Sequence, residues 1–259
     1  MPAADLSQLT AIIPTADRAQ GLQRLVRSLR RKYPRLRIVV ADASIERARP
    51  RPGIDSIQLP ARSGRSAACN ALLARVRTPY FLLLSDTCEL PRETSLEKLH
   101  ALVADDKLDV AAADLVACMR RFWVFVRRRP LAEHGLMEIA GNHLTLSHGY
   151  RTHGDGFFWC DFVSNFFVAR TEKVRALGGW DQELQNDERE EFFVRAHRRG
   201  LRVGLVPEVV AWLWKDRPES RVPDQSRACK SLAVAKMGLA QMTDFDGRII
   251  KAPRRAMAA

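Results

Sequence analysis

Apolar runs alternate with segments of helical spacing along the first 116 residues. The runs at 9–14, 36–41 and 80–84 are mostly aliphatic or aromatic, which is typical of strands buried on both faces of a sheet. Residues 19–32 and 66–76 place their apolar side chains at helical spacing. A shorter strand, a helix and a further strand are predicted over 54–60, 93–104 and 108–116. This repetition predicts an α/β fold with right-handed crossovers and a mostly parallel sheet flanked by helices.

The pattern is less regular after residue 116. Residues 120–129 have a central apolar run with basic flanks, and residues 130–160 are rich in Gly, His and aromatic side chains, which favours a long functional loop. A strand, a helix with an acidic start and a basic end, and one or two strands broken at a proline are predicted over 162–169, 187–200 and 201–214. The tail from Pro223 onward is moderately amphipathic and predicts a helix.

Polar side chains follow three of the predicted strands at the point where each strand ends. The segments are Pro14-Thr15-Ala16-Asp17, Asp42-Ala43-Ser44 and Ser85-Asp86-Thr87. In open parallel sheets, ligands bind at the carboxyl ends of the strands, so these segments are expected to converge on one crevice. Asp17 is also a candidate N-cap for the helix at 19–32.

Composition limits the classes of protein. Hydrophobic residues make up 46% of the 259, enough for a sizeable core, and 42 Lys and Arg against 30 Asp and Glu give a net charge of +12. Such a charge permits an anionic partner without choosing among nucleotide, nucleic acid, acidic glycan and lipid. Five scattered cysteines indicate reduced thiols. No run approaches a membrane span and the start does not resemble a secretory signal, so a cytoplasmic protein is expected.

Each candidate ligand residue has a structural alternative. Asp86 could hold a divalent cation on a diphosphate, or serve as a turn or cap carboxylate. Asp42 could accept hydrogen bonds from a base or ribose, or close a turn. Arg65 could offer a cation beside the free N–H groups of a helix start, or be solvated charge, and Asn70, one turn later, could face either way.

An acidic cluster opens the helix predicted at 187–200. Its members are Asp187, Glu188, Glu190 and Glu191. Acidic side chains at a helix start are stabilised by the macrodipole, and a carboxylate that faces the crevice could deprotonate an acceptor hydroxyl. Three histidines spaced five apart, His143, His148 and His153, do not have the spacing of ligands on a helix face, so a zinc site is not favoured.

Taken together in chain order, these segments resemble a known family. The matching segments are TAIIPTADRAQGLQRLVRSL, IVVADAS, RSAACNALLARVRTPYFLLLSDTCELP, VSNFFVARTEKVRALGGWDQEL and DEREEFFVRAHRRGLRV, which cover residues 10–206 with a gap at about 117–161. The set resembles the inverting, nucleotide-sugar-dependent glycosyltransferases of family 2, which have the GT-A fold. NFFVARTEKVRALGGWD and EEFFVRAHRRGLRV are similar to ganglioside-type β-1,4-N-acetylgalactosaminyltransferases.

The resemblance implies a role for each candidate residue. Pro14, Thr15 and Asp17 would line the nucleotide pocket, Asp42 would pair with uracil, and Arg65 and Asn70 would face the base and diphosphate. Ser85 and Asp86 would lie at the metal motif, with Asp86 binding Mn²⁺ or Mg²⁺. Gly179, Trp180 and Asp181 would shape the acceptor site. The candidates for the general base are, in order of preference, Glu188, Glu191 and Asp187. Residues 1–222 would form the GT-A domain, with a nucleotide-sugar half at about 8–116 and an acceptor half at about 117–222, and 223–259 would be a C-terminal helical tail.

Three departures from the family pattern keep two functions open. Ser85 and Thr87 flank a single aspartate at the metal motif, Arg189 fills the position of the usual base, and the late VVAWLW segment has no histidine. One expected function is inverting transfer of GalNAc, Gal or GlcNAc from a UDP-sugar to a hydroxyl of a glycan or lipid-linked acceptor, as in polysaccharide biosynthesis. The alternative is a weak or inactive nucleotide-sugar-binding or scaffold protein. The basic segment at 120–129 adds an anionic membrane surface as a partner, with peripheral cytoplasmic localisation; nucleic acid is the least favoured partner.

Overall fold

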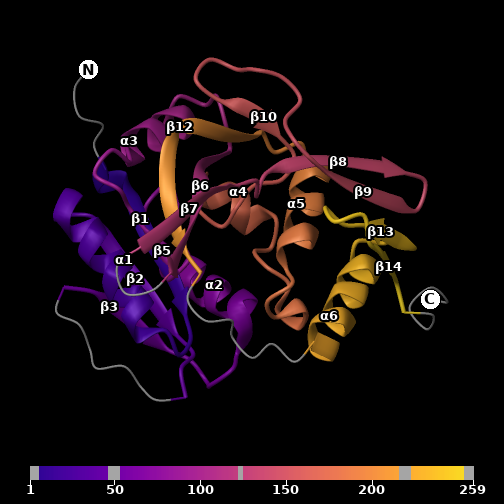
Figure 1. The fold of residues 1–259 in the computed structure, drawn as a ribbon, viewed down its shortest axis with the longest axis horizontal. Helices are drawn as coiled ribbons and strands as arrows, with labels where there is room; N and C mark the ends of the chain where they lie inside the picture. The colour runs from indigo at the N-terminus through magenta and orange to yellow at the C-terminus, as the bar shows by residue number, and fades with distance from the viewer. Residues whose placement is uncertain (1–5, 46–52, 122–124, 216–222, 254–259) are drawn as a thin grey trace.

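The computed structural model describes residues 6–45, 53–121, 125–215 and 223–253, and its larger sheet confirms the predicted α/β class (Figure 1). Its strands are β1 (Leu9–Thr15), β2 (Arg37–Asp42), β3 (Asp55–Gln58), β4 (Tyr80–Leu83), β5 (Cys88–Glu89), β6 (Val110–Arg121), β7 (Phe125–Leu131), β10 (Phe158–Cys160), β11 (Phe167–Arg170) and β12 (Val203–Trp214). The order β10-β12-β6-β11-β4-β1-β2-β3 has four parallel and three antiparallel neighbours, so the path is mostly parallel.

Helices cover both faces of this sheet. They are α1 (Ala19–Lys32), α2 (Gly64–Arg75), α3 (Leu96–Ala104), α4 (Thr171–Ala176) and α5 (Arg189–Arg198), with short 3-10 turns η1 (Leu6–Gln8) and η2 (Gln182–Leu184). The side chains of Leu25 and Leu99 bring α1 and α3 into one buried cluster, and those of Leu72 and Phe193 bring α2 and α5 into the other. Because strand side chains alternate, β1 supplies Ile13 to the first cluster and Ile12 to the second.

The segment 130–160, predicted as a long loop, instead contributes two strands to a second sheet, and its ends belong to β7 and β10 of the larger one. Strands β8 (Gly135–Ala140) and β9 (His143–His148) pair in the order β14-β13-β9-β8 with β13 (Gln241–Thr243) and β14 (Ile249–Lys251). The helical tail predicted for 223–259 is also wrong in part, because within the described residues 223–253 the helix α6 (Pro223–Lys236) is followed by strands β13 and β14. Met137, Leu144 and Val234 join the same buried cluster as α2 and α5, so the tail packs into the main core.

Strand β12 confirms the proline-interrupted strand as one element. It pairs in parallel with β6 throughout, with a register shift between Val206 and Val210 on either side of Pro207. A proline lacks the N–H that a ladder needs, so an irregularity there is expected. Asp17, by contrast, is not the N-cap of α1: Arg18 occupies that position, without a side-chain cap.

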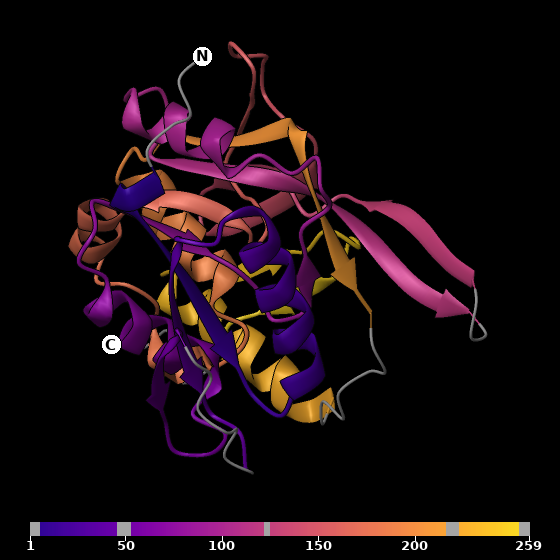
Figure 2. The same cartoon turned by 90° about the vertical axis from the view of Figure 1, so that its left-hand side faces the viewer.

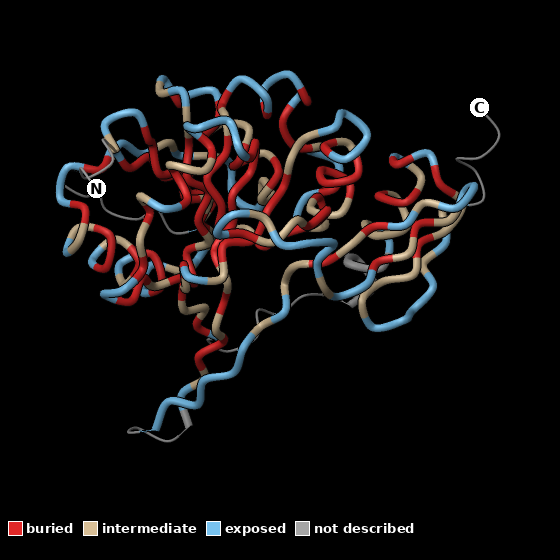
Figure 3. The backbone as a smooth tube through the Cα atoms, turned by 90° about the horizontal axis from the view of Figure 1, so that it is seen from above, coloured by how far each residue is buried: buried red, intermediate tan, exposed pale blue. Residues whose placement is uncertain are grey.

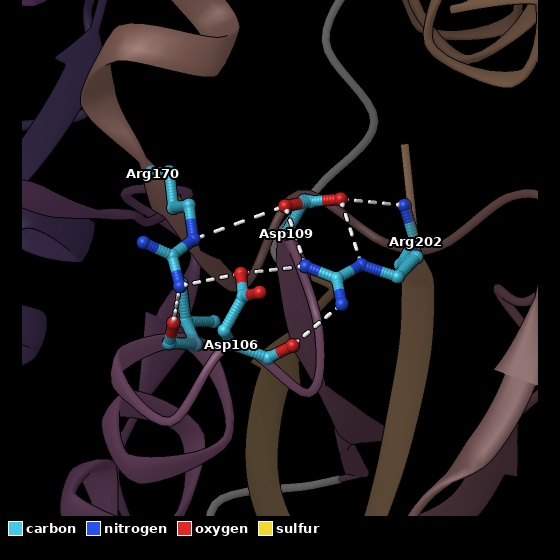
Figure 4. A network of polar contacts seen from close by, with 5 residues as sticks. Asp106, Asp109, Arg170 and Arg202 are labelled. Carbon is cyan, nitrogen blue, oxygen red and sulfur yellow. Dashed lines mark hydrogen bonds and ion pairs between the residues drawn. The ribbon is translucent and has the colours of Figure 1, made fainter. Parts of the chain in front are cut away.

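An ion-pair network joins three elements at the amino-terminal edge of the sheet (Figure 4). Asp109, immediately before β6, accepts a hydrogen bond from the Arg202 backbone N–H at 2.9 Å and lies 3.8 Å from Nε of Arg170. Asp106 accepts from the guanidinium groups of Arg202 at 2.7 Å and Arg170 at 2.9 Å. The network therefore fixes β6, β11 and β12 to one another far from the opposite, carboxyl edge.

Candidate active site

The polar ends of β1, β2 and β4 meet at the carboxyl edge, as the sequence predicts. Thr15 and Asp42 are direct neighbours in the parallel register of β1 and β2. The Thr15 hydroxyl donates a hydrogen bond to Oδ2 of Asp86 at 2.7 Å. All three residues are buried, so their polar atoms are preorganised by protein contacts rather than by solvent.

The start of α1 comes very close to Asp86. Nη1 of Arg18 lies 3.8 Å from Oδ1 of Asp86, and a Cβ on Gly21 would lie 2.7 Å from the Asp86 carbonyl oxygen. Only glycine permits this approach. The first N–H groups of a helix form its positive end and favour an anion such as a diphosphate. Gly21 is not among the residues predicted from the sequence, although an isolated glycine in a helical pattern is a signal of such close packing.

Asp42 and Asp17 shape the neighbouring turn. Oδ1 of Asp42 accepts from the backbone N–H of Ser44 at 2.9 Å and from its hydroxyl. Asp17 has a positive φ of 53°, donates its N–H to the Ser44 hydroxyl at 2.8 Å and accepts from the N–H of Ile45 at 2.9 Å. Pro14 lies within β1 and is half-buried. The turn alternative therefore holds for Asp42, and it orients the carboxylate at the strand end.

Glu188 is the buried carboxylate of the acidic cluster. It is 1% exposed, and Nη1 of Arg65 lies 3.7 Å from its Oε1. Its Oε2 has no hydrogen-bond partner among the described residues. Burial raises the pKa of Glu188, and Arg65 offsets only part of that effect. The backbone N–H of Arg65 donates to Oδ1 of Asn186 at 3.0 Å, which fixes the start of α2 beside this carboxylate.

Glu191 and Asp187 are less suited to a base. Both carboxylate oxygens of Glu191 accept from Arg195, with 2.8 Å between Nη2 and Oε2. Arg195 also donates to the carbonyls of Leu177 at 2.7 Å and Gly179 at 2.9 Å. Glu191 thus holds the cation that closes the loop after α4. Asp187 is half-buried. Burial raises the pKa of the Cys229 thiol in α6, and the negative charge of Asp187 raises it further.

The predicted ligand and acceptor residues around Asn70 are mainly structural. Asn70 donates to the Trp180 carbonyl at 2.7 Å and accepts from the Trp180 N–H at 2.9 Å, so both ends of its amide hold backbone. The Trp180 ring is 4% exposed and stacks on Phe192 at 5.1 Å, inside the core rather than in an open site. A Cβ on Gly179, whose φ is positive, would lie 2.3 Å from Oδ1 of Asn70. Asp181 caps η2 through the N–H of Glu183 and pairs with Lys236 at 2.8 Å.

Comparison with known proteins decides the family. The family model described as glycosyl transferase family 2 matches residues 10–167. This chain belongs to glycosyl transferase family 2. It is 32% identical over 206 residues to β-1,4 N-acetylgalactosaminyltransferase 1 of Homo sapiens and 28% identical over 208 residues to β-1,4 N-acetylgalactosaminyltransferase 2 of Mus musculus. Each match covers 78% of this chain, which spans only 38% of the length of either relative.

Solved structures share the fold of this family member. A crystal structure of GalNAc-T7 with UDP, GalNAc and Mn²⁺ matches with a TM-score of 0.70 and 13% identity, over 87% of this chain and 47% of that one. Staphylococcus aureus TarS (residues 1–349) in complex with UDP-GlcNAc matches with a TM-score of 0.62 and 16% identity, over 88% and 66% of the two chains. The fold is therefore that of the GT-A glycosyltransferases.

The segment 85–87, expected to be the metal motif, offers one carboxylate. The Ser85 and Thr87 hydroxyls are hydrogen-bonded to each other at 2.8 Å beside Asp86. Within the described part of the chain, no three His, Cys, Asp or Glu side chains are grouped to hold a metal ion. Mg²⁺ and Mn²⁺ in nucleotide sites commonly take one or two carboxylates and complete their shell with phosphate and water. Asp86 therefore fits a cation shared with a diphosphate, not one held by protein alone.

Arg189, at the position of the family's usual base, is paired with a carboxylate from another element. Its Nη1 lies 2.6 Å from Oε2 of Glu133, and its guanidinium stacks over the Phe162 ring at 4.6 Å. The Glu133 side chain is 31% exposed. Burial raises the pKa of the Cys88 thiol, two residues after Asp86, and the negative charge of Glu133 adds to that rise. Glu133 is not among the residues predicted from the sequence, because it lies in the segment between β7 and β8 and no motif marks it.

Proposed function

We propose that this chain transfers a sugar from a UDP-sugar to a hydroxyl group of a glycan or glycolipid, with inversion at the anomeric carbon. The observation that carries the proposal is the contact between Thr15 and Asp86 beside Asp42, at the carboxyl edge of a GT-A sheet. In folds of this kind, that edge is where nucleotides bind.

On the donor side, protein groups match the two parts of UDP. The Asp42 carboxylate, oriented by Ser44, is placed to accept from a uracil N–H or a ribose hydroxyl. Arg18 and the start of α1 lie at Asp86, where their positive charge would favour the diphosphate. A Mn²⁺ or Mg²⁺ ion bound by Asp86 would supply further neutralisation of the departing diphosphate.

On the acceptor side, Glu188 is proposed to take the proton from the attacking hydroxyl. Its raised pKa makes it a stronger base than an exposed glutamate, and its Oε2 has no partner in the described residues. General base catalysis of this kind contributes about 10²–10⁴-fold. The ion pair with Arg65 keeps Oε1 turned toward α2. Oε2 is buried, so the acceptor hydroxyl would reach it only when the side chains that cover it move.

We further propose that the donor is UDP-GalNAc, with the Gal and GlcNAc donors as alternatives. The support is the likeness to two β-1,4 N-acetylgalactosaminyltransferases. A panel of UDP-sugars tested for hydrolysis and transfer would identify the donor. The anomeric configuration of the product, measured by NMR, would contradict inversion if the donor configuration were kept.

A second candidate function is nucleotide-sugar binding with weak or no catalysis. The observation in its favour is that Arg189 stands at the position expected for the base and pairs with Glu133, so this position supplies no carboxylate. UDP binding without hydrolysis or transfer across a broad acceptor panel would support this function over the first.

The test of both is nucleotide binding by variants at Asp86. We expect UDP with Mn²⁺ to raise the Tm of the natural chain and of Asp55→Asn, which changes an exposed aspartate on β3. Asp86→Asn should lose most of this shift. Absence of any shift with UDP and other nucleotides in the natural chain would refute the proposal.

A further inference from the structure

The β6–β7 hairpin extends well beyond the carboxyl edge of the sheet (Figure 2). Ala112 of β6 is level with Phe167 of β11, which is level with Leu83 at the end of β4. Strand β6 continues for nine residues past Ala112, to Arg121. At about 3.3 Å per residue, this extension is roughly 30 Å long. Because β4 and β6 run in the same direction, the hairpin projects from the edge that carries Asp86.

The distal part of the hairpin is a two-stranded ribbon with exposed apolar and basic side chains. The pairing of β12 with β6 ends at Cys118, and β7 alone accompanies β6 beyond it. Phe125 is 71% exposed and Val126 is 42% exposed, and exposed Arg127 and Arg129 follow. Figure 3 shows the projecting arm as mostly exposed. Residues 122–124, the centre of the basic-flanked segment in the sequence, lie outside the described residues.

Cation–π contacts hold the hairpin against β12. The Arg128 guanidinium lies over the Trp212 ring at 4.3 Å, and that of Arg120 lies over the Trp214 ring at 5.4 Å. Trp214 also donates its indole N–H to Glu89 at 2.7 Å. Such cation–π contacts contribute about 0.5–2 kcal/mol each. The exposed side chains are thus presented on a supported arm, although an isolated two-stranded ribbon is marginal in water.

We propose that this hairpin docks the protein on an anionic membrane surface, with Phe125 and Val126 at the level of the lipid headgroups and Arg127 and Arg129 on the lipid phosphates. An apolar tip with arginines behind it matches the layered polarity of a bilayer interface. Arginines near an anionic leaflet are attracted electrostatically. No helix in the described ranges is long and apolar enough to cross a membrane, so the arm would act as a surface contact.

Charge and side-chain type disfavour the other occupants. A second copy of a chain with a net charge of +12 would bring two basic arms together. Single-stranded nucleic acid stacks its bases on aromatic side chains, and of the two exposed apolar side chains Phe125 could take that role whereas Val126 could not. A membrane also agrees with the direction of the arm, since the crevice would then open on the lipid side; this last point rests on the proposed transfer to a lipid-linked acceptor.

Vesicle flotation tests the proposal directly. The full chain is mixed with vesicles of phosphatidylcholine alone, or of phosphatidylcholine and phosphatidylglycerol in a two-to-one ratio. We expect binding to the anionic vesicles, weaker binding at high salt, and little binding to the neutral ones. Arg127→Ser with Arg129→Ser should weaken binding roughly 30-fold, from two lost charges. Phe125→Ser should also weaken it.

Matched variants separate docking from general charge or hydrophobicity. Arg35→Ser with Arg75→Ser removes two exposed arginines near the opposite edge of the sheet, and Ile249→Ser removes an exposed apolar side chain on β14 that is 59% accessible. Both controls should bind as the natural chain does, and UDP should stabilise all variants equally. No binding by the natural chain, equal loss in the controls, dimerisation through Phe125 without vesicle binding, or tighter binding to single-stranded DNA through the same residues would overturn the proposal.

Discussion

Replacing Glu188 with glutamine should stabilise the protein while it removes the proposed base. Burial raises the pKa of this carboxyl, so the folded protein binds its proton more tightly than the unfolded chain does. The free energy of unfolding is therefore unaffected below the unfolded pKa, and it falls as the pH rises from the unfolded pKa through the folded pKa. Glutamine does not ionise, so Glu188→Gln avoids this loss and should be more stable than the natural chain at neutral pH.

The size of the effect follows from linkage. Each unit by which the folded pKa exceeds the unfolded pKa costs about 1.4 kcal/mol of unfolding free energy at a pH above both. For a chain of this length, that corresponds to a Tm difference of about 3–6 °C per unit. The side chain of Arg65 is 36% exposed, so water can solvate its charge once the carboxylate is gone. The loss of the pair should therefore not cancel the gain.

The assay is thermal unfolding of both proteins at a series of pH values from about 5 to 8, combined with transfer or hydrolysis of the donor. Glu172→Gln, which changes an exposed carboxylate at the start of α4, is the control and should show no pH-dependent gain. The Tm gap for Glu188→Gln should widen with pH while activity falls about 10²-fold or more. A gap that stays constant across this range, or full activity in the variant, would refute the reasoning.

Two further predictions concern the packing around the site and the opposite edge. Gly21→Ala places a Cβ 2.7 Å from the Asp86 carbonyl oxygen, where ordinary contact begins at 3.4 Å, so the carbonyl must move by about 3.4 − 2.7 = 0.7 Å. The overpacking should cost about 1–3 kcal/mol of stability, which the higher helix propensity of alanine partly offsets. Calorimetry should show weaker UDP binding by this variant than by Gln20→Ala, which changes an exposed residue of the same helix. Unchanged UDP affinity would contradict it. Asp109→Asn weakens the buried end of the ion-pair network and should lower stability by about 2–3 kcal/mol, less than a fully buried pair because Arg202 is partly exposed. Denaturation would show this loss with unchanged UDP affinity, while exposed Asp105→Asn would show neither.

The first half of the fold could be predicted because its signals are local. Helix α1 begins and ends at the predicted residues 19–32, since one apolar face packs on a continuous buried sheet. The second sheet could not be predicted in the same way. Each strand of β8 and β9 is short and partly polar, and β9 pairs with β13, about a hundred residues later. The alternation of Met137, Leu144 and Leu146 was the local signal, but glycine and histidine around it favoured a loop.

Part of the candidate site could likewise be predicted from local sequence, and part could not. Thr15, Asp42 and Asp86 could be predicted to meet because the ends of neighbouring parallel strands share an edge. The roles of the acidic residues depend on partners that the local sequence does not show. Glu188 faces Arg65, which lies 123 positions away, since 188 − 65 = 123, whereas Glu191 faces Arg195 on its own helix. The spacing of the acidic cluster alone therefore does not show which glutamate pairs with an arginine of another helix and which pairs within its own.

The pair formed by Arg189 and Glu133 bears on the choice between the two candidate functions. The Arg189 guanidinium is paired with Glu133 at 2.6 Å and stacked on Phe162, and burial raises the pKa of Glu188 more than the charges of Arg65 and Arg189 lower it. An arginine at this position therefore does not by itself remove a base, because the neighbouring Glu188 keeps one carboxylate oxygen without a described partner. A buried carboxylate with a raised pKa lowers stability at neutral pH and adds nothing to folding that glutamine could not supply. Such costly groups concentrate at functional sites, which favours the transferase over the binding protein.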